Sequence, residues 1–218
     1  MITDTSNHTL QAILFDFDGV LVDSEPIHYQ CWKELLQPFG IHLDWESYLG
    51  TCVGVAERAM LERLVSFATR PVTVDELFAL YPVKKRRFIE LMEAAMPFAP
   101  GIGEFLNRLE HYRLAVVSSS GRSEVEPLLE LAGIRRYFGA VVCGSEAGPL
   151  KPSPEPYLLS ARLLGIQSAL VVEDSDTGEA SGRAAGFDVL RVGHPLEVQP
   201  ALADKLGMRD VVPIDDFR

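Results

Sequence analysis

The sequence DFDGVLVD, residues 16–23, decides the fold, and it directly follows the apolar run Ala12–Phe15. The apolar run predicts a strand. Two carboxylates, Asp16 and Asp18, therefore lie at its carboxyl end, where open α/β sheets bind their ligands. Gly19 permits a backbone turn that a larger residue would resist, so both acids can point into one crevice. The alternative is a simple turn that carries two solvated acids.

Four more apolar runs resemble the first, because they are short, aliphatic and without polar alternation. They span residues 114–117, 140–143, 169–172 and 189–192. Such runs are typical of strands covered on both faces, as in a parallel sheet. Segments with helical spacing lie between them, at 102–111, 122–132, 154–164 and 178–185. The alternation predicts an α/β fold built on a doubly wound parallel sheet.

The interval between the first and second strands breaks this alternation, because it spans about a hundred residues, most of them with helical spacing. We expect a helical insert at 24–96, between the two parts of an α/β core formed by 1–23 and 97–218. Helices are predicted over 24–39, over 44–49 with an end at Gly50, and over 55–68. Thr73 and Glu76 form a capping-box pair that opens a further helix. Pro82 should kink or interrupt this helix before it resumes through residue 96.

Composition and charge restrict the class of protein. The chain has 218 residues, 47% of them hydrophobic and 23% charged, as in ordinary globular proteins. Its formal net charge of −11 would repel a phosphate backbone, so we expect no nucleic-acid partner. Cys31, Cys52 and Cys143 are odd in number and widely spaced, which indicates reduced thiols. Residues 1–11 show no leader pattern and no segment has the length of a membrane span. We therefore expect a cytoplasmic monomer or weak homo-oligomer that contacts no membrane.

Polar side chains also follow the other predicted strands. Glu173 and Asp174 come directly after the run 169–172, and these acids and those after the first strand could share one hard divalent cation. Ser118 closes the run 114–117, and Lys151 precedes the helical segment 154–164. A hydroxyl and an ammonium at this level can hold phosphoryl oxygens. Taken singly, the acids and the serine could only cap helices, and the lysine could be an ordinary surface residue.

Four ordered motifs give the chain its resemblance to the haloacid dehalogenase-like phosphohydrolase superfamily. They are DFDGVLVDSEP at 16–26, Ser118, Lys151-Pro152 and Glu173-Asp174-Ser175. The chain is most similar to the β-phosphoglucomutase-like branch, whose subfamily IA members carry a helical cap domain after the first motif. The resemblance covers essentially the whole chain, and it implies that the insert at 24–96 is such a cap.

The resemblance implies a role for each motif residue. Asp16 would be the nucleophile that forms an aspartyl-phosphate, and Asp18 the general acid and base. Ser118 and Lys151 would bind the phosphoryl group. True dehalogenases lack the second acid, so Asp18 favours phosphoryl transfer.

The same resemblance implies a Mg²⁺ cofactor. Its protein ligands would be the Asp16 carboxylate, the backbone carbonyl of Asp18 and the Asp174 carboxylate. Glu173 would lie beside these ligands without coordinating the ion itself. Carboxylate and carbonyl oxygens suit this ion, which usually completes its coordination with water and substrate phosphate.

Substrate contacts are predicted for Ser119 and Arg122, which follow Ser118, and for the insert residue His28. Arg122 could equally only begin its helix, and His28 could be simply packed or exposed. Mutases of this branch carry an arginine that grips a second phosphate, and Glu57 stands at that position, with Arg58 beside it. The basic run 84–87 is interpreted as a solvated helix face.

The predicted function is a Mg²⁺-dependent phosphatase that acts on a small phosphorylated metabolite, such as a sugar phosphate or polyol phosphate. Two alternatives remain at this point. One is a β-phosphoglucomutase-like sugar phosphomutase, which would return the phosphoryl group to a bound sugar. The other is a binding protein without catalytic activity.

Overall fold

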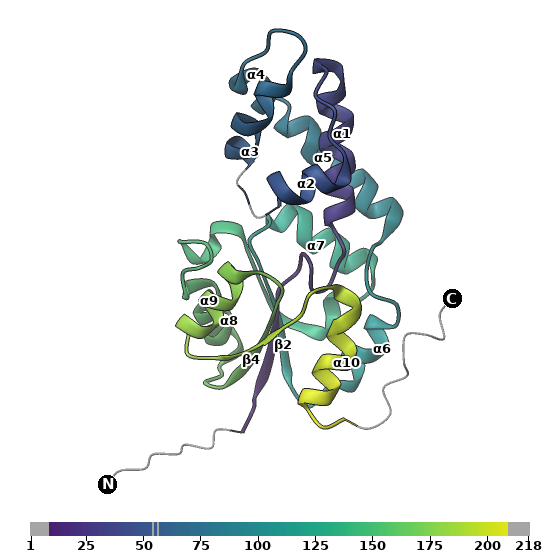
Figure 1. Cartoon of the computed structure of the whole chain (residues 1–218). Coiled ribbons are helices and arrows are strands. Elements are labelled where there is room, and N and C mark those ends of the chain that lie inside the picture. Colours follow the sequence, from purple (N-terminus) through teal and green to yellow (C-terminus); the bar gives the residue numbers. More distant parts are fainter. Residues whose placement is uncertain (1–8, 54, 56, 209–218) are drawn as a thin grey trace. The chain divides into compact units, whose positions relative to one another are not determined.

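The computed structural model describes residues 9–53, 55 and 57–208, so most of the stretch 1–11, where no leader is expected, lies outside the described residues. The chain folds into two compact units (Figure 1). The first is an α/β unit that comprises residues 1–23 and 97–218, and the second is a helical unit, 24–96. No helix of the described residues is both long and apolar enough to cross a membrane.

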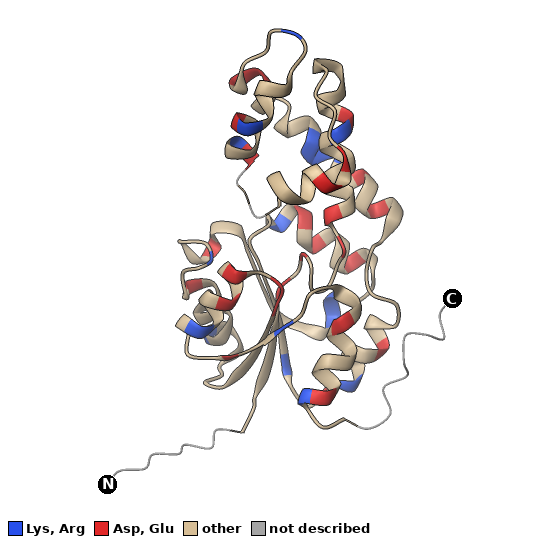
Figure 2. Ribbon diagram, in the orientation of Figure 1, with Lys and Arg blue, Asp and Glu red and all other residues tan. Residues whose placement is uncertain are grey.

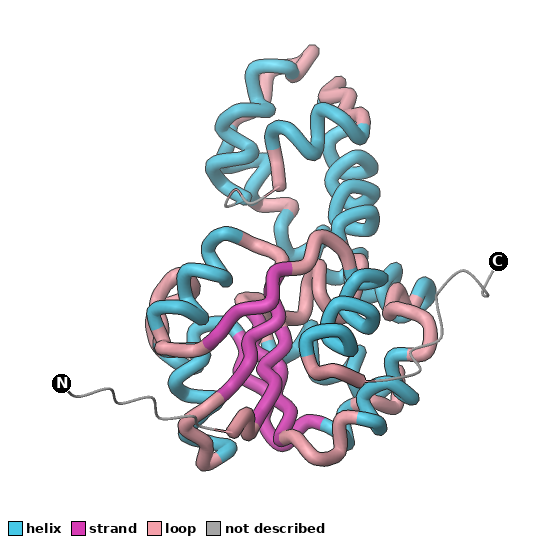
Figure 3. The backbone as a smooth tube through the Cα atoms, turned by 60° about the horizontal axis from the view of Figure 1, so that its bottom comes forward, coloured by secondary structure: helices cyan, strands magenta, loops and turns pink. Residues whose placement is uncertain are grey.

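The α/β unit is built on a parallel sheet, as predicted, and its strands are magenta in Figure 3. The sheet has five strands in the order β3-β2-β1-β4-β5. The strands are β1 (Ala12–Phe15), β2 (Arg113–Ser118), β3 (Phe138–Cys143), β4 (Ala169–Glu173) and β5 (Asp188–Arg191). Phe15 at the end of β1 pairs with Val116 of β2 and Val172 of β4. The residues that follow these three strands therefore emerge at one edge of the sheet.

Helices cover both faces of this sheet (Figures 1 and 3). They are α6 (Ile102–Arg108), α7 (Arg122–Leu131), α8 (Glu155–Leu164), α9 (Asp176–Ala184) and α10 (Pro195–Lys205), with short 3₁₀ turns at η3 (Arg135–Tyr137) and η4 (Gly144–Ala147). The first four agree with the predicted segments, and α10 was not predicted. On one face Tyr157 and Ala161 of α8 pack against Leu14 and Val117 of the central strands. This apolar packing holds the central strands in place.

Helix α10 and the residue before it contact both ends of the α/β unit at which the chain connects to the helical unit. His194, the residue before α10, lies 3.4 Å from the Asp23 carboxylate through Nε2. Gln199 Nε2 donates to the carbonyl of Pro100 at 2.7 Å. The Asp23 amide in turn donates to the carbonyl of Pro97 at 2.9 Å. The two points at which the chain leaves and re-enters this unit are therefore held together.

The helical unit consists of α1 (Glu25–Leu36) with η1 (Gln37–Phe39), α2 (Trp45–Thr51), α3 (Glu57–Leu64) with η2 (Val65–Phe67), α4 (Val74–Phe78) and α5 (Tyr81–Ala95). The capping box of Thr73 and Glu76 is confirmed. The break between α4 and α5 precedes Pro82, which lies in the first turn of α5, where a missing N–H costs nothing. The prediction that α2 ends at Gly50 is wrong, because the helix continues through Thr51.

Acidic and basic positions are interspersed along the helices of each unit (Figure 2). Acidic residues are the more numerous, 31 against 20.

Candidate active site

Lys151 is the centre of a buried charged group at the edge of the sheet. Its Nζ donates to Asp16 Oδ1 at 2.7 Å, to Glu173 Oε1 at 2.6 Å and to the carbonyl of Val117 at 2.9 Å. The side chain of Lys151 is only 5% exposed. The structure thus brings together three residues that the sequence places after three different strands.

The pKa values in this group reflect its excess of carboxylates. Burial raises the pKa of Asp16 to about 8, and Lys151 opposes the rise only in part. Burial and the neighbouring Glu173 raise the pKa of Asp174 to about 6. Burial alone would lower the pKa of Lys151. The effect of the two carboxylates that Lys151 contacts is larger, and the pKa of Lys151 is raised. One ammonium therefore does not neutralise this group, and a further cation would stabilise it.

Glu173 is fixed from several directions. The Tyr157 hydroxyl donates to Glu173 Oε1 at 2.7 Å, and the Ser175 hydroxyl donates to Oε2 at 3.1 Å. The backbone amides of Asp174 and Ser175 also donate to Oε2. A Cβ on Gly178 would lie 1.9 Å from the Glu173 carboxylate carbon, so only glycine fits there. Sequence reasoning missed Tyr157, although a tyrosine on a buried helix face indicates a partner for its hydroxyl.

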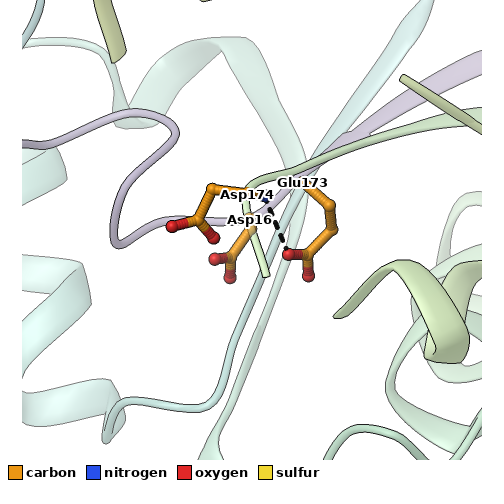
Figure 4. Close-up of side chains that lie close together, drawn as sticks. All are labelled: Asp16, Glu173 and Asp174. Carbon is orange, nitrogen blue, oxygen red and sulfur yellow. Dashed lines mark hydrogen bonds between the residues drawn. The ribbon is translucent and has the colours of Figure 1, made fainter. Parts of the chain in front are cut away.

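The donor atoms at this edge of the sheet fit a metal ion. Asp16, Glu173 and Asp174 each offer a carboxylate oxygen, and these oxygens lie within 4.8 Å of one another (Figure 4). Glu173 already accepts hydrogen bonds on both oxygens, so Asp16 and Asp174 are the carboxylates suited to coordination. Such hard oxygen donors fit Mg²⁺. Gly19 has a φ of +74°, and a Cβ there would lie 2.0 Å from Asp174 Oδ2.

The second acid of the first motif contacts the loop after β2. Ser120 Oγ lies 2.7 Å from Asp18 Oδ2. The Ser120 amide donates to Ser118 Oγ at 3.0 Å, and Ser118 is 3% exposed. Ser119, between them, is exposed. Asp18 and Ser118 are therefore linked through Ser120, which the sequence analysis did not single out as a site residue.

Arg122, which is predicted to contact substrate, pairs with residues outside the Lys151 group. Its guanidinium pairs with Glu146 at 2.7 Å and with Glu126, and it donates to the carbonyl of Val141 at 2.6 Å. These contacts join the start of α7 to the end of β3 and to η4. Arg122 is the first residue of α7, and its contact with substrate stays a prediction.

The helical unit has a polar pocket of its own, of about 130 Å³, whose lining includes His28, Glu57 and Lys84. Lys84 is 4% exposed, so the interpretation of the basic run as a solvated face is wrong for this residue. Its Nζ lies 2.7 Å from His28 Nδ1 and 3.8 Å from Glu57 Oε1. Burial and Lys84 lower the pKa of His28 to about 3, so this imidazole is neutral.

Comparison with known proteins identifies the family. The model of the haloacid dehalogenase-like hydrolases matches residues 13–192, and the chain belongs to this family. A phosphorylated carbohydrates phosphatase of Thermotoga maritima is 28% identical, with 89% of this chain and 91% of the relative covered. The β-phosphoglucomutase of Bacillus subtilis is 27% identical, with 92% and 89% covered.

A solved structure agrees with these matches. The crystal structure of a variant of CbbY from Rhodobacter sphaeroides, in complex with xylulose-1,5-bisphosphate, superposes with a TM-score of 0.69 at 25% identity. The alignment covers 84% of this chain and 86% of that protein. The chain is accordingly an enzyme of the phosphoric monoester hydrolases in the haloacid dehalogenase-like superfamily.

Proposed function

We propose that the chain is a Mg²⁺-dependent phosphatase of a small phosphorylated metabolite, a sugar phosphate or similar polyol phosphate. The observation that carries this proposal is that the carboxylates of Asp16 and Asp174 and the ammonium of Lys151 lie together at one edge of the sheet. In the proposal they serve as nucleophile, cation ligand and phosphate-binding group. The names of the curated relatives, which include a phosphatase of phosphorylated carbohydrates, support the substrate class.

The reaction begins at Asp16. One of its carboxylate oxygens bonds to phosphorus while the bond from phosphorus to the substrate alcohol breaks, and Asp18 gives its proton to the departing alcohol. Asp18 then takes a proton from a water molecule that attacks the aspartyl-phosphate. Inorganic phosphate leaves, and the Asp16 carboxylate is restored. Lys151 and Ser118 hold the phosphoryl oxygens through both steps.

Asp16 and Asp174, with the backbone carbonyl of Asp18, would hold the Mg²⁺. When bound, the ion supplies positive charge that reduces the repulsion between a carboxylate nucleophile and a phosphate dianion. Glu173 keeps Lys151 in place and is not a ligand in this proposal.

In this proposal the two compact units have separate tasks. The α/β unit, residues 1–23 and 97–218, is the catalytic core domain. The helical unit, 24–96, is the cap domain, which selects the substrate. His28 and Lys84 line the pocket of that unit and are its candidate substrate contacts.

A phosphomutase is the second candidate, because a β-phosphoglucomutase is among the relatives. A mutase must bind a second phosphate while the sugar reorients, which requires cationic groups. Lys84 has a carboxylate partner, Glu57, at 3.8 Å. Arg58 is engaged as well, since it contacts Asp75 at 2.7 Å and Glu62 at 3.8 Å. These pairings favour hydrolysis over transfer of the phosphoryl group back to a bound sugar.

The test is phosphate release from a panel of phosphorylated metabolites in the presence of Mg²⁺. We expect sugar or polyol monophosphates to give the highest kcat/KM, and Asp16→Asn to give no measurable turnover on any of them. Phosphorus NMR of β-glucose 1-phosphate with a bisphosphate primer separates the two candidates. Glucose 6-phosphate appearing faster than inorganic phosphate would establish the mutase instead.

A further inference from the structure

Ser120 touches both of the groups that the proposed reaction uses to move a proton and to bind phosphate. Its hydroxyl lies 2.7 Å from Asp18 Oδ2, and its backbone amide donates to Ser118 Oγ at 3.0 Å. Asp18 and Ser118 follow different strands, and Ser120 is half-buried between them. It is thus placed to set the position of one relative to the other.

The hydroxyl of Ser120 is not used to cap the helix that follows. The residue before α7 is Gly121, whose amide donates to Glu124 Oε2 at 3.0 Å, and this carboxylate closes the first turn. A serine in front of a helix most often serves as its cap. Here the cap position belongs to the next residue, and the Ser120 side chain is directed to Asp18 instead.

A hydroxyl suits this contact because it both donates and accepts hydrogen bonds. It donates to Asp18 when the carboxyl is ionised, and it can accept from Asp18 when the carboxyl carries the proton. The contact therefore holds in both states that a general acid and base must visit. A group that only donates, such as a backbone N–H or an ammonium, would favour the ionised state of Asp18 only.

The backbone of Ser120 has a matching effect on Ser118. Because the amide proton occupies one lone pair of Ser118 Oγ, the hydroxyl proton of Ser118 is directed elsewhere. In the proposed reaction this proton is donated to a phosphoryl oxygen. One residue thus orients the phosphate-binding hydroxyl through its main chain and the acid–base carboxyl through its side chain.

We propose that Ser120 is a positioning residue for proton transfer, which holds Asp18 where it protonates the leaving alcohol. This inference rests on the proposed function, in which Asp18 is the general acid. The contribution of a well-placed acid depends on the leaving group, because a weakly basic phenolate departs with little protonation. A loss of activity that depends on the leaving group therefore distinguishes a positioning role of Ser120 from a general structural role.

The experiment compares kcat/KM of Ser120→Ala on para-nitrophenyl phosphate and on an alkyl phosphate. This parameter reports only the steps through release of the first product, so the later hydrolysis of the aspartyl-phosphate does not enter. We expect a loss of roughly 10- to 100-fold on the alkyl ester and less than about threefold on the aryl ester. Ser120→Thr, which keeps a hydroxyl, should restore most of the alkyl activity.

Two controls make the result decisive. Ser123→Ala removes an exposed hydroxyl from the same segment and should leave both activities unchanged. Ser120→Gly removes the hydroxyl without a methyl group in the turn and should reproduce the alkyl-specific loss. Equal losses on the two esters, or no loss on either, would overturn the role of Ser120. Asp18→Asn is measured in parallel, and absence of leaving-group dependence in that variant would instead refute Asp18 as the acid.

Discussion

Replacing Tyr157 with phenylalanine tests the buried network behind Lys151. The Tyr157 hydroxyl and the Lys151 ammonium donate to the same oxygen of Glu173, at 2.7 and 2.6 Å. Burial and the neighbouring carboxylates raise the pKa of Tyr157, so the phenol keeps its proton and is the donor. Glu173 is fully buried, so bulk water does not reach its carboxylate to replace the lost hydroxyl. Tyr157→Phe removes only this donor and keeps the ring.

The expected cost is about 1.5–3 kcal/mol, the usual range for a hydrogen bond to a charged group. For a chain of this size each kcal/mol lowers the thermal midpoint by about 2–4 °C, so a loss of ~2 kcal/mol corresponds to about 4–8 °C. The measurement is urea unfolding, followed by circular dichroism in the presence of EDTA. Ser160→Ala is a matched control, because its buried hydroxyl, on the same helix α8, donates to a backbone carbonyl and not to Glu173.

A double-mutant cycle isolates the contact itself. A hydrogen bond to a neutral acceptor contributes about 0.5–1.5 kcal/mol, so in a Glu173→Gln background Tyr157→Phe should cost about 1–2 kcal/mol less than in the parent chain. Similar slopes of the unfolding curves would show that all four proteins lose the same structure. A coupling energy below about 0.5 kcal/mol would refute the idea that Tyr157 stabilises the Glu173 charge.

Three further outcomes are expected. Gly19→Ala should lower kcat/KM by at least about 100-fold, because a Cβ there lies 2.0 Å from Asp174 Oδ2. Gly186→Ala is the control, because Gly186 has a similar φ of +83° but open space around it. This variant should lower the free energy of unfolding by about 1 kcal/mol and leave activity unchanged. EDTA should abolish phosphate release from any substrate and Mg²⁺ should restore it, and activity in excess chelator would exclude the metal. Burial and Lys84 lower the pKa of His28 from 6.5 to about 3, so only the unfolded chain takes up this proton between those values. Stability should then fall by up to about 1.4 kcal/mol per pH unit below pH 6.5, and His28→Gln should reduce this slope in thermal unfolding.

The sheet and the residues after its strands could be predicted because they depend on local patterns. Strands β1 to β4 each contain a continuous apolar run, whereas β5 has the sequence DVLR. Parallel strands bring their carboxyl ends to one edge whatever the connections between them. For this reason Asp16, Ser118 and Glu173 emerge together in the structure as expected. Helix α10 was missed because Pro195 begins it and Pro200 lies inside it, a composition that indicates a loop.

Contacts between distant residues could not be predicted in the same way. Lys84 belongs to a run of four basic residues, and nothing in that run distinguishes the one that turns inward toward His28. Arg122 begins α7, and its carboxylate partner Glu146 lies on η4, beyond β3 in the chain. The partner of a long charged side chain is decided by tertiary packing, and a pattern along one segment does not contain that information.

The buried position of Glu173 can be explained by the negative charge that Lys151 needs beside it during turnover. In the proposed reaction Asp16 alternates between a carboxylate and an aspartyl-phosphate, so its attraction for Lys151 changes at every step. Glu173 keeps its negative charge throughout, because the Lys151 contact, assisted by the Tyr157 hydroxyl, lowers its pKa against the effect of burial. A lysine held by Asp16 alone would exchange its only carboxylate partner for phosphoryl oxygens whenever the intermediate formed, whereas Glu173 is a carboxylate partner that does not change during the reaction. In the proposed reaction Glu173, which is not a metal ligand there, thus allows the same ammonium to serve both half-reactions.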